Sequence, residues 1–125
     1  MSGNRYLLDT NAAIALINGN QQLLQLTSKA NHVALSIISV IEFLSFPSLT
    51  EKDKNLFFEF KDETEIINVN MDDIILVENI IALRKQYKIK LPDSIMAASA
   101  ISYNCQLISN DTGFNKIETL SVITF

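Results

Sequence analysis

The feature of this sequence that most limits its fold is a regular alternation of short apolar segments with longer helical patterns. Strand-like segments are expected at residues 5–8, 33–36, 66–69, 106–109 and 121–124. Helical patterns separate them, near residues 11–18, 21–30, 37–46, 51–63, 72–86 and 92–103. Because strands separated by helices are joined by right-handed crossovers, the sequence predicts a largely parallel sheet covered on both faces. We therefore expect an α/β three-layer sandwich, with residues 1–125 forming a single domain.

Composition excludes several other classes of protein. The chain is 48% hydrophobic and has only three Gly and two Pro, which leaves little room for linkers or disorder. Its apolar runs are interrupted too often for a membrane span, and its first residues do not resemble a signal peptide. The single cysteine, Cys105, excludes an internal disulfide and fits a reducing compartment. We therefore expect a cytoplasmic globular protein with Cys105 in or near the core, and with the only histidine, His32, structural or exposed.

Four acidic residues stand where a parallel sheet places ligands, outside the carboxyl ends of its strands. Asp9 directly follows the first strand, and Asp111 follows the fourth with only Asn110 between them. Asp93 begins the helix that leads into the fourth strand, and Glu42 lies in the second turn of the helix that leaves the second strand. Four carboxylates from distant segments are therefore expected to converge on one edge of the sheet.

Three of these acids also have a simpler interpretation when each is taken alone. Glu42 is the only charge in the apolar segment 37–46, but a thin stripe of Ser39, Glu42 and Ser45 allows that side to face water. Asp93 follows Pro92 and has the position of a helix-capping residue, and Asp111 is a plausible turn residue. The other ten acids lie in charged helices, at a helix start or in turns, where solvent exposure is expected. A functional role is therefore indicated by the convergence of the four acids on one edge of the sheet.

A cluster of carboxylates raises the pKa of its members and is stable mainly when a cation occupies it. Oxygen ligands without histidine or cysteine select a hard ion, Mg²⁺ or Mn²⁺, over zinc. Such a site suits the hydrolysis of phosphodiester bonds. The polar neighbours of the acids, which are candidates for orienting carboxylates or water, are Thr10, Asn11, Ser109 and Asn110.

The segments that carry these acids resemble the PIN-domain family. They are Leu8-Asp9-Thr10-Asn11, Glu42 in its apolar helix, Leu91-Pro92-Asp93-Ser94-Ile95-Met96-Ala97-Ala98-Ser99-Ala100, and Ser109-Asn110-Asp111-Thr112-Gly113-Phe114. In size the chain resembles the small ribonuclease toxins of VapBC-type toxin–antitoxin pairs. The resemblance implies a PIN-like fold with a five-stranded parallel sheet in the order 3-2-1-4-5.

The resemblance also implies an activity, that of an endoribonuclease dependent on Mg²⁺ or Mn²⁺. Asp9, Glu42, Asp93 and Asp111 match the acidic positions of the family and take its catalytic, metal-binding role. Members of this type are often homodimers held inactive by a small antitoxin that inserts a segment into the acidic groove. Many relatives have a further acid where this chain has Gly113, so the site is one acid short for a second ion. The apolar helices near 11–30 are the expected dimer surface.

Charge places a further limit on how RNA would bind. The formal net charge of −4 argues against loose electrostatic binding over the whole surface. A basic run at residues 84–90 leads directly into the Leu-Pro-Asp motif, and in it Lys88 and Lys90 are candidates for holding RNA phosphate. The alternative is a helix end whose cations complement the helix dipole, followed by a solvated loop.

Three rival functions use a similar fold or similar acids. A phosphotransfer receiver expects an acidic pair after the first strand, where Asp9 stands alone, and an acceptor Asp after the third, where Asn70 stands. A haloacid-dehalogenase-like phosphatase expects a second Asp where this chain has Asn11. Both fit less well than a nuclease. A catalytically silent PIN-like module that binds RNA or protein remains the alternative.

Overall fold

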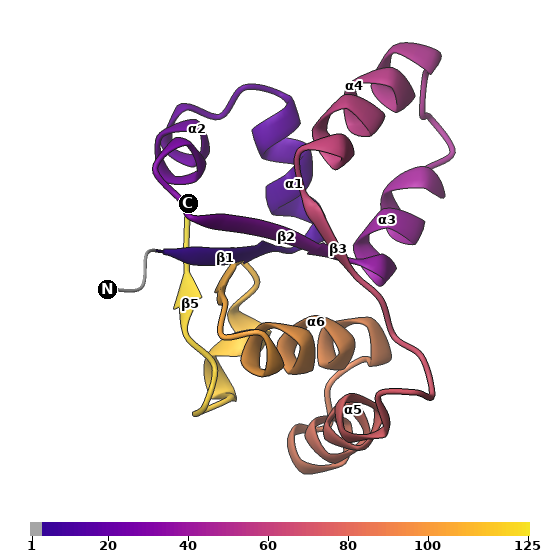
Figure 1. The fold of residues 1–125 in the computed structure, drawn as a ribbon, viewed down its shortest axis with the longest axis vertical. Helices are drawn as coiled ribbons and strands as arrows, with labels where there is room; N and C mark the ends of the chain where they lie inside the picture. The colour runs from indigo at the N-terminus through magenta and orange to yellow at the C-terminus, as the bar shows by residue number, and fades with distance from the viewer. Residues whose placement is uncertain (1–3) are drawn as a thin grey trace.

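The computed structural model describes residues 4–125 and confirms the α/β sandwich (Figure 1). Within these residues the strands form one parallel sheet in the order β3-β2-β1-β4-β5, which is the order that the resemblance implies. The strands are β1 (Arg5–Leu8), β2 (His32–Ser36), β3 (Glu65–Ile67), β4 (Gln106–Ile108) and β5 (Val122–Ile123).

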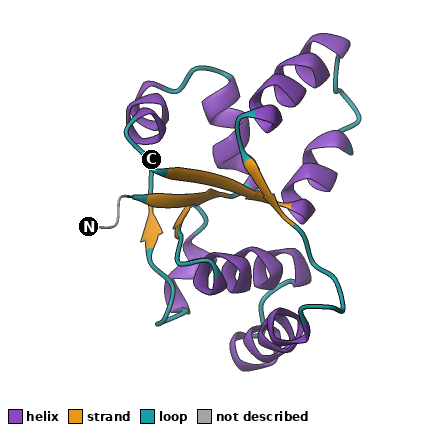
Figure 2. Cartoon of the chain, viewed as in Figure 1, coloured by secondary structure: helices purple, strands orange, loops and turns teal. Residues whose placement is uncertain are grey.

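Helices cover both faces of the sheet, as Figures 1 and 2 show. One face carries α1 (Thr10–Ile17), α2 (Gln21–Ser28), α3 (Ile37–Leu44) and α4 (Glu51–Asp62). The other carries α5 (Ile74–Tyr87) and α6 (Leu91–Ser102). These helices begin and end within two residues of the expected positions. A short 3₁₀ helix, η1 (Thr112–Lys116), was not expected from the sequence.

The start of α5 shows why a helix boundary moves by two residues. Asp72 and Asp73 were both expected inside this helix, but Asp73 is its N-cap and Asp72 lies in the turn before it. The Asp73 side chain accepts a hydrogen bond of 3.1 Å from the amide of Leu76. By accepting from the unpaired amide of Leu76, the Asp73 side chain takes the N-cap position, so α5 starts one residue after it.

Adjacent residues of β1 point into two separate cores, because side chains alternate across a strand. Leu7 packs with Leu107 and Ala97 on the side of α6. Leu8 packs with Leu35 on the side of α1 and α3. All of these side chains are fully buried. Burial on both faces explains why the strand sequences are continuously apolar and show no alternation with polar residues.

The hydrogen-bond ladder continues one residue past the carboxyl ends of the central strands. The amide of Asp9 donates to the carbonyl of Ile108 across 3.1 Å, and the amide of Ser109 donates to the carbonyl of Ile123 across 2.9 Å. The backbones of Asp9 and Ser109 are therefore fixed at the same edge of the sheet. In the described part of the chain, every helix is too short or too polar to cross a bilayer.

Candidate functional site

All four acids predicted from the sequence line one cavity at the carboxyl edge of the sheet, with a volume of about 270 Å³. Each comes from a different segment: the end of β1, α3, the start of α6 and the turn after β4. The remaining lining residues are Thr10, Asn11, Phe46, Met96 and Phe114. The fold thus brings together acids that are far apart in the sequence.

Asp9 is the most buried of the four and is 7% exposed. It is the N-cap of α1, and its Oδ1 accepts a hydrogen bond of 2.7 Å from the amide of Ala12. Burial raises the pKa of Asp9 above its ordinary value of 3.8, although the Ser109 hydroxyl and the Ala12 amide favour the ionised form. The carboxylates of Asp111 and Glu42 raise this pKa further. Asp9 is therefore held rigidly in a place where a negative charge is unfavourable without a cation.

Asp93 lies in the first turn of α6, where Pro92 also stands and where no side chain caps the helix. Burial raises the pKa of Asp93, and the nearby charge of Asp111 adds to this, while Lys90 lowers it. The small residues that follow, Ala97, Ala98 and Ala100, are buried at 1% exposure or less. They allow α6 to lie close to the sheet and bring Asp93 to its edge.

Glu42 is oriented by a neighbour from another helix. The Thr10 hydroxyl donates a hydrogen bond of 2.5 Å to Oε1 of Glu42. Thr10 is only 9% exposed, so its own position is set by packing. Glu42 is half-buried and lines the acidic cavity, and of the serines in its stripe Ser39 is buried while Ser45 is exposed.

Asp111 is held by a tight turn. Its amide donates a hydrogen bond of 3.0 Å to the Ser109 hydroxyl, and its Oδ1 accepts one of 2.8 Å from the amide of Gly113. A Cβ added at Gly113 would lie 3.1 Å from that same oxygen. The absence of a side chain at Gly113 therefore allows the Asp111 carboxylate to lie close to its backbone. An acidic residue at this position would push that carboxylate away.

The polar neighbours expected around the acids divide into two groups. Thr10 and Asn11 line the cavity, and Ser109 contacts Asp9 and Asp111. Asn110 instead pairs with the last residue: its Nδ2 donates to the carbonyl of Phe125 across 2.8 Å, and its Oδ1 accepts from the amide of Phe125 across 2.7 Å. Asn110 therefore fixes the end of the chain beside β4.

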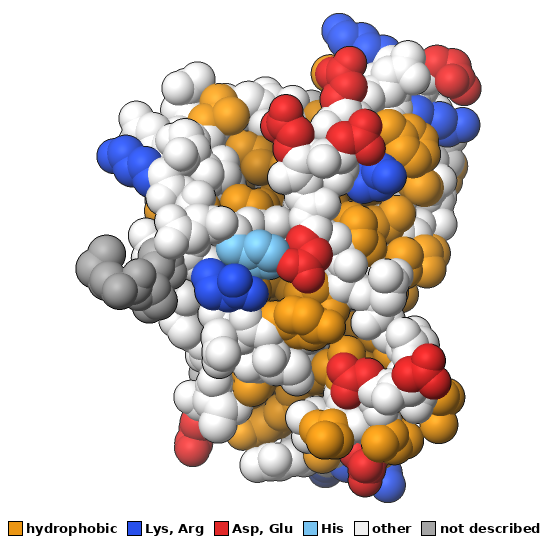
Figure 3. Space-filling model, viewed as in Figure 1, with side chains coloured by type: hydrophobic (Ala, Val, Ile, Leu, Met, Phe, Trp, Pro, Cys, Tyr) orange, Lys and Arg blue, Asp and Glu red, His pale blue; other side chains and the backbone are white. Residues whose placement is uncertain are grey.

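The two candidate phosphate-binding lysines are placed differently. Lys90 is the N-cap of α6, three residues before Asp93, and its charge acts on that carboxylate. Lys88 ends α5 in a left-handed conformation and lines another surface cavity, together with Arg84, Lys85 and Leu91. Across the face shown in Figure 3, acidic and basic side chains are interspersed with apolar ones.

The donor chemistry of the cavity fits a hard divalent cation, since its ionisable groups are all carboxylates. Within residues 4–125, however, no three His, Cys, Asp or Glu side chains are arranged to hold one ion. Like charges separate when no cation bridges them. Ligation by three or four of these acids therefore requires their side chains to turn inward from the positions seen here.

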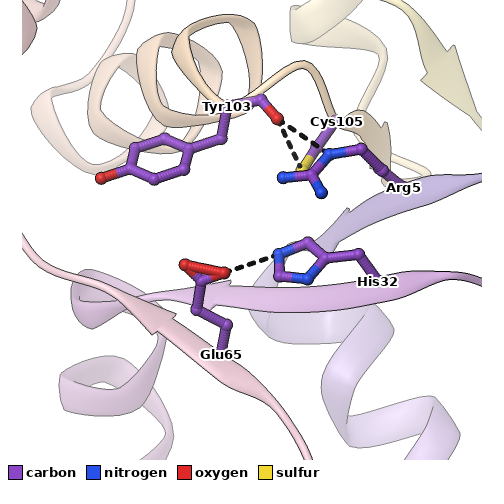
Figure 4. A network of polar contacts seen from close by, with 5 residues as sticks. All are labelled: Arg5, His32, Glu65, Tyr103 and Cys105. Carbon is purple, nitrogen blue, oxygen red and sulfur yellow. Dashed lines mark hydrogen bonds and ion pairs between the residues drawn. The ribbon is translucent and has the colours of Figure 1, made fainter. Parts of the chain in front are cut away.

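Cys105 and His32 lie at the opposite edge of the sheet, in the polar network of Figure 4. The Cys105 thiol is 3.6 Å from the carbonyl oxygen of Tyr103, which also accepts a hydrogen bond of 3.1 Å from Nε of Arg5. Nε2 of His32 lies 2.8 Å from Oε1 of Glu65. Burial raises the pKa of the thiol, which keeps it protonated and unreactive. These residues connect strand ends, as expected of structural residues.

Sequence reasoning did not identify three apolar residues of the cavity, Phe46, Met96 and Phe114. Met96 and Phe114 are buried core residues whose identity carries no functional signal. Phe46 is 41% exposed and follows Glu42 by four residues. In the sequence it is one more apolar residue after the apolar helix α3, so no signal there marked it.

Comparison with solved structures finds similar folds in bacterial toxin–antitoxin complexes. A chain of a toxin–antitoxin complex from Klebsiella pneumoniae is 30% identical, with a TM-score of 0.72 over 95% of this chain and 96% of that one. A chain of VapBC2 from Rickettsia felis, bound to a DNA fragment from its promoter, is 25% identical, with a TM-score of 0.81 over 97% and 98% of the two chains. VapBC-1 from nontypeable Haemophilus influenzae has the same fold at 21% identity, with a TM-score of 0.79 over 96% and 97% of the two chains.

Comparison with curated proteins gives no match. The sequence model of the PIN-domain family matches residues 6–120, a range that includes all four acids of the cavity. The match covers nearly the whole chain and agrees with the strand order and with the position of the acids. The chain therefore belongs to the PIN-domain family.

Proposed function

We propose that this protein is a divalent-metal-dependent endoribonuclease and the toxin of a toxin–antitoxin pair. The observation that carries the proposal is the convergence of Asp9, Glu42, Asp93 and Asp111 on one cavity at the carboxyl edge of the sheet. The raised pKa values of Asp9 and Asp93 support it, because both residues are destabilised as anions unless a cation is present. Membership of the PIN-domain family supports a nuclease over the rival phosphotransfer and phosphatase functions.

In this proposal the four carboxylates hold Mg²⁺ or Mn²⁺. When bound, such an ion supplies an activated water and neutralises charge on the phosphate in the transition state. Asp9 contributes a fixed ligand because the Ala12 amide and the end of β1 hold it in place. Thr10 directs one oxygen of Glu42, and Ser109 supports Asp9 and Asp111. Gly113 leaves this side of the cavity without a fifth acid, which favours one firmly bound ion.

The similar solved structures, which are toxin–antitoxin complexes, support the antitoxin in this proposal. We expect a small antitoxin that covers the acidic cavity, RNA as the substrate, and a homodimer formed through α1 and α2. The setting is the cytoplasm. A short antitoxin-like reading frame next to the gene, whose product co-purifies with this chain, would support the assignment to a toxin–antitoxin pair.

The test is a cleavage assay on structured RNA with Mg²⁺ or Mn²⁺, run on the wild type, Asp9→Asn and Asp93→Asn. Asparagine is the appropriate replacement at position 9 because its amide oxygen can still cap α1. Glu78→Gln on α5, an exposed acid outside the cavity, is the matched control. Metal-dependent cleavage that is lost in both Asp variants and kept in the control supports the proposal.

The alternative, a catalytically silent module, makes a different prediction in the same assay. The purified wild type would cut no RNA with either metal, and the Asp variants would behave like it. Cleavage that persists unchanged in Asp9→Asn and Asp93→Asn would point to a contaminating nuclease and would reject the site.

A further inference from the structure

An exposed aromatic residue, Phe46, separates the acidic cavity from a second cavity. Phe46 lines both of them. The second cavity, called here the flanking pocket, has a volume of about 130 Å³ and lies where the ends of α1 and α3 meet the start of α4. Its lining includes Ile14, Phe43 and Phe46 on the apolar side, and Asn18, Ser48 and Asp53 on the polar side.

The ring of Phe46 is held in place from behind. It packs edge-on against Phe43, with ring centroids 6.3 Å apart, and Phe43 stacks on the fully buried Phe57 at 4.4 Å. The backbone is also fixed, since the Phe46 amide donates to the carbonyl of Phe43 and the Phe46 carbonyl accepts from the amide of Leu49. The following Pro47 restricts the conformation of Phe46. Phe46 is therefore a rigid aromatic surface that is 41% exposed.

We propose that Phe46 and the flanking pocket bind one unpaired nucleobase of the RNA, next to the phosphate at the acidic cavity. This inference rests on the proposed function and adds to it a base-binding subsite beside the acids, which requires an unpaired nucleotide. Proteins read unpaired bases by stacking them on aromatic side chains, and bases inside a duplex cannot be reached in this way. At about 130 Å³ the flanking pocket is slightly smaller than the closed cavity of about 150 Å³ that holds a benzene ring, so a base stacked on Phe46 enters it by one edge from the open side.

The mixed lining of the pocket favours a base over an apolar side chain of a protein partner. A base has an apolar face and a polar edge, and the pocket offers both kinds of surface. Oδ2 of Asp53 accepts from the amide of Thr50 across 3.1 Å, and the side chains of Asn18 and Ser48 add a donor and acceptors at the same rim. Because Phe46 borders both cavities, a base stacked on it belongs to a nucleotide adjacent to the acids.

The experiment compares RNA binding and cleavage by the wild type, Phe46→Ala, Phe46→Trp and Phe58→Ala. Phe58 on α4 is the matched control because it is 45% exposed and lines neither cavity. The substrates are one single-stranded RNA, the same RNA as a duplex, and single-stranded versions with one abasic position each. Affinity is measured by fluorescence anisotropy without metal, and kcat and KM are measured with Mg²⁺ or Mn²⁺.

We expect Phe46→Ala to weaken binding of the single strand by about 5- to 150-fold, the range that corresponds to stacking one base. Phe46→Trp should retain binding, and Phe58→Ala should leave it unchanged. The abasic RNA that lacks the stacked base should bind the wild type and Phe46→Ala equally. This equality separates a base contact from a general loss of structure. If Phe46→Ala does not fold, Phe46→Leu keeps the apolar bulk without the aromatic face and replaces it.

The inference is overturned if Phe46→Ala binds single strands as the wild type does, if Phe58→Ala loses as much, or if the duplex is preferred. It is also overturned if Phe46→Ala and Phe46→Leu leave RNA binding intact but abolish binding of a co-expressed antitoxin. Its failure can be distinguished from that of the proposed function. If the Phe46 variants cleave RNA as the wild type does, only the base-binding proposal is rejected. If RNA binding depends on Phe46 but no RNA is cleaved, only the nuclease proposal is rejected.

Discussion

The hydroxyl of Thr10 donates a hydrogen bond of 2.5 Å to Oε1 of Glu42 and so joins the first turn of α1 to the second turn of α3. The two helices leave neighbouring strands, β1 and β2. Thr10 is directly bonded to Asp9 in the chain, so this contact sets the position of one acid relative to another. The geometry of the acidic cavity therefore depends on a residue that carries no charge.

Thr10→Val keeps the shape of the side chain but removes the donor. We expect it to lower metal affinity or cleavage by about 10- to 100-fold, the usual cost of losing a hydrogen bond to a metal ligand. Thr10→Ser keeps the hydroxyl and should retain most of the activity. Cleavage rates measured at several metal concentrations give both the metal affinity and the maximal rate. If Thr10→Val and the wild type give the same curve, Glu42 does not need the Thr10 hydroxyl to orient it.

Metal should stabilise the native state, since only the folded chain brings the carboxylates together. At a concentration of about 100 times Kd, Mg²⁺ or Mn²⁺ should add about 2.7 kcal/mol and raise Tm by several degrees. Asp9→Asn and Asp93→Asn should lose most of this shift, while Glu78→Gln should keep it. Without metal, the two Asp variants should be no less stable than the wild type, because repulsion is relieved. Thermal unfolding with metal and with chelator tests this, and a metal-independent wild-type Tm would contradict it.

The metal-free protein should become more stable relative to Asp93→Asn as the pH falls. Burial and the charge of Asp111 raise the pKa of Asp93 in the folded chain above its ordinary value of 3.8. The ionised form is therefore penalised in the native state, and this penalty disappears as the pH falls through the raised pKa toward the ordinary one. Urea unfolding of both proteins between neutral pH and pH about 4, with chelator, measures the difference. A difference in stability that stays constant with pH would mean that the pKa of Asp93 is not raised in the folded state.

Lys90 should contribute more to RNA binding than Lys88, since its charge acts on Asp93 while Lys88 lines another cavity. Charge reversal at either lysine should weaken binding, and Lys90→Gln should reduce the slope of log K against log salt by about 1. Lys52→Gln on α4, exposed and away from this corner, serves as the control. Binding curves at several salt concentrations measure both effects. If affinity and slope are unchanged in both lysine variants, Lys88 and Lys90 do not bind RNA, and they belong only to a helix end and a solvated loop.

Much of the fold was predictable because its signals are local. Apolar strands joined by helical patterns predict a parallel sheet, and burial of Leu7 and Leu8 in opposite cores explains why β1 is apolar throughout. Asp9 and Asp93 were identifiable because each stands at a joint between a strand or loop and a helix. The 3₁₀ helix η1 and the exact start of α5 could not be predicted, because a single turn depends on one or two side-chain hydrogen bonds.

Pairings between distant residues could not be predicted from the sequence. The contact of Thr10 with Glu42, and the role of Asn110 in holding Phe125, depend on how helices and strand ends pack in space. Phe46 is the clearest case, because in the sequence it is one more apolar residue after an apolar helix. Its exposure and its place between two cavities appear only when α3 is packed against α1 and α4.

The sequence by itself determined the α/β class, the strand and helix segments and the four acids that stand at the carboxyl edge, because periodicity and position at a strand end are properties of local sequence. Only the tertiary structure decided how those acids meet. The burial of Asp9 and the hydrogen-bond donors that hold Asp9 and Glu42 follow from how the helices and strand ends pack in space.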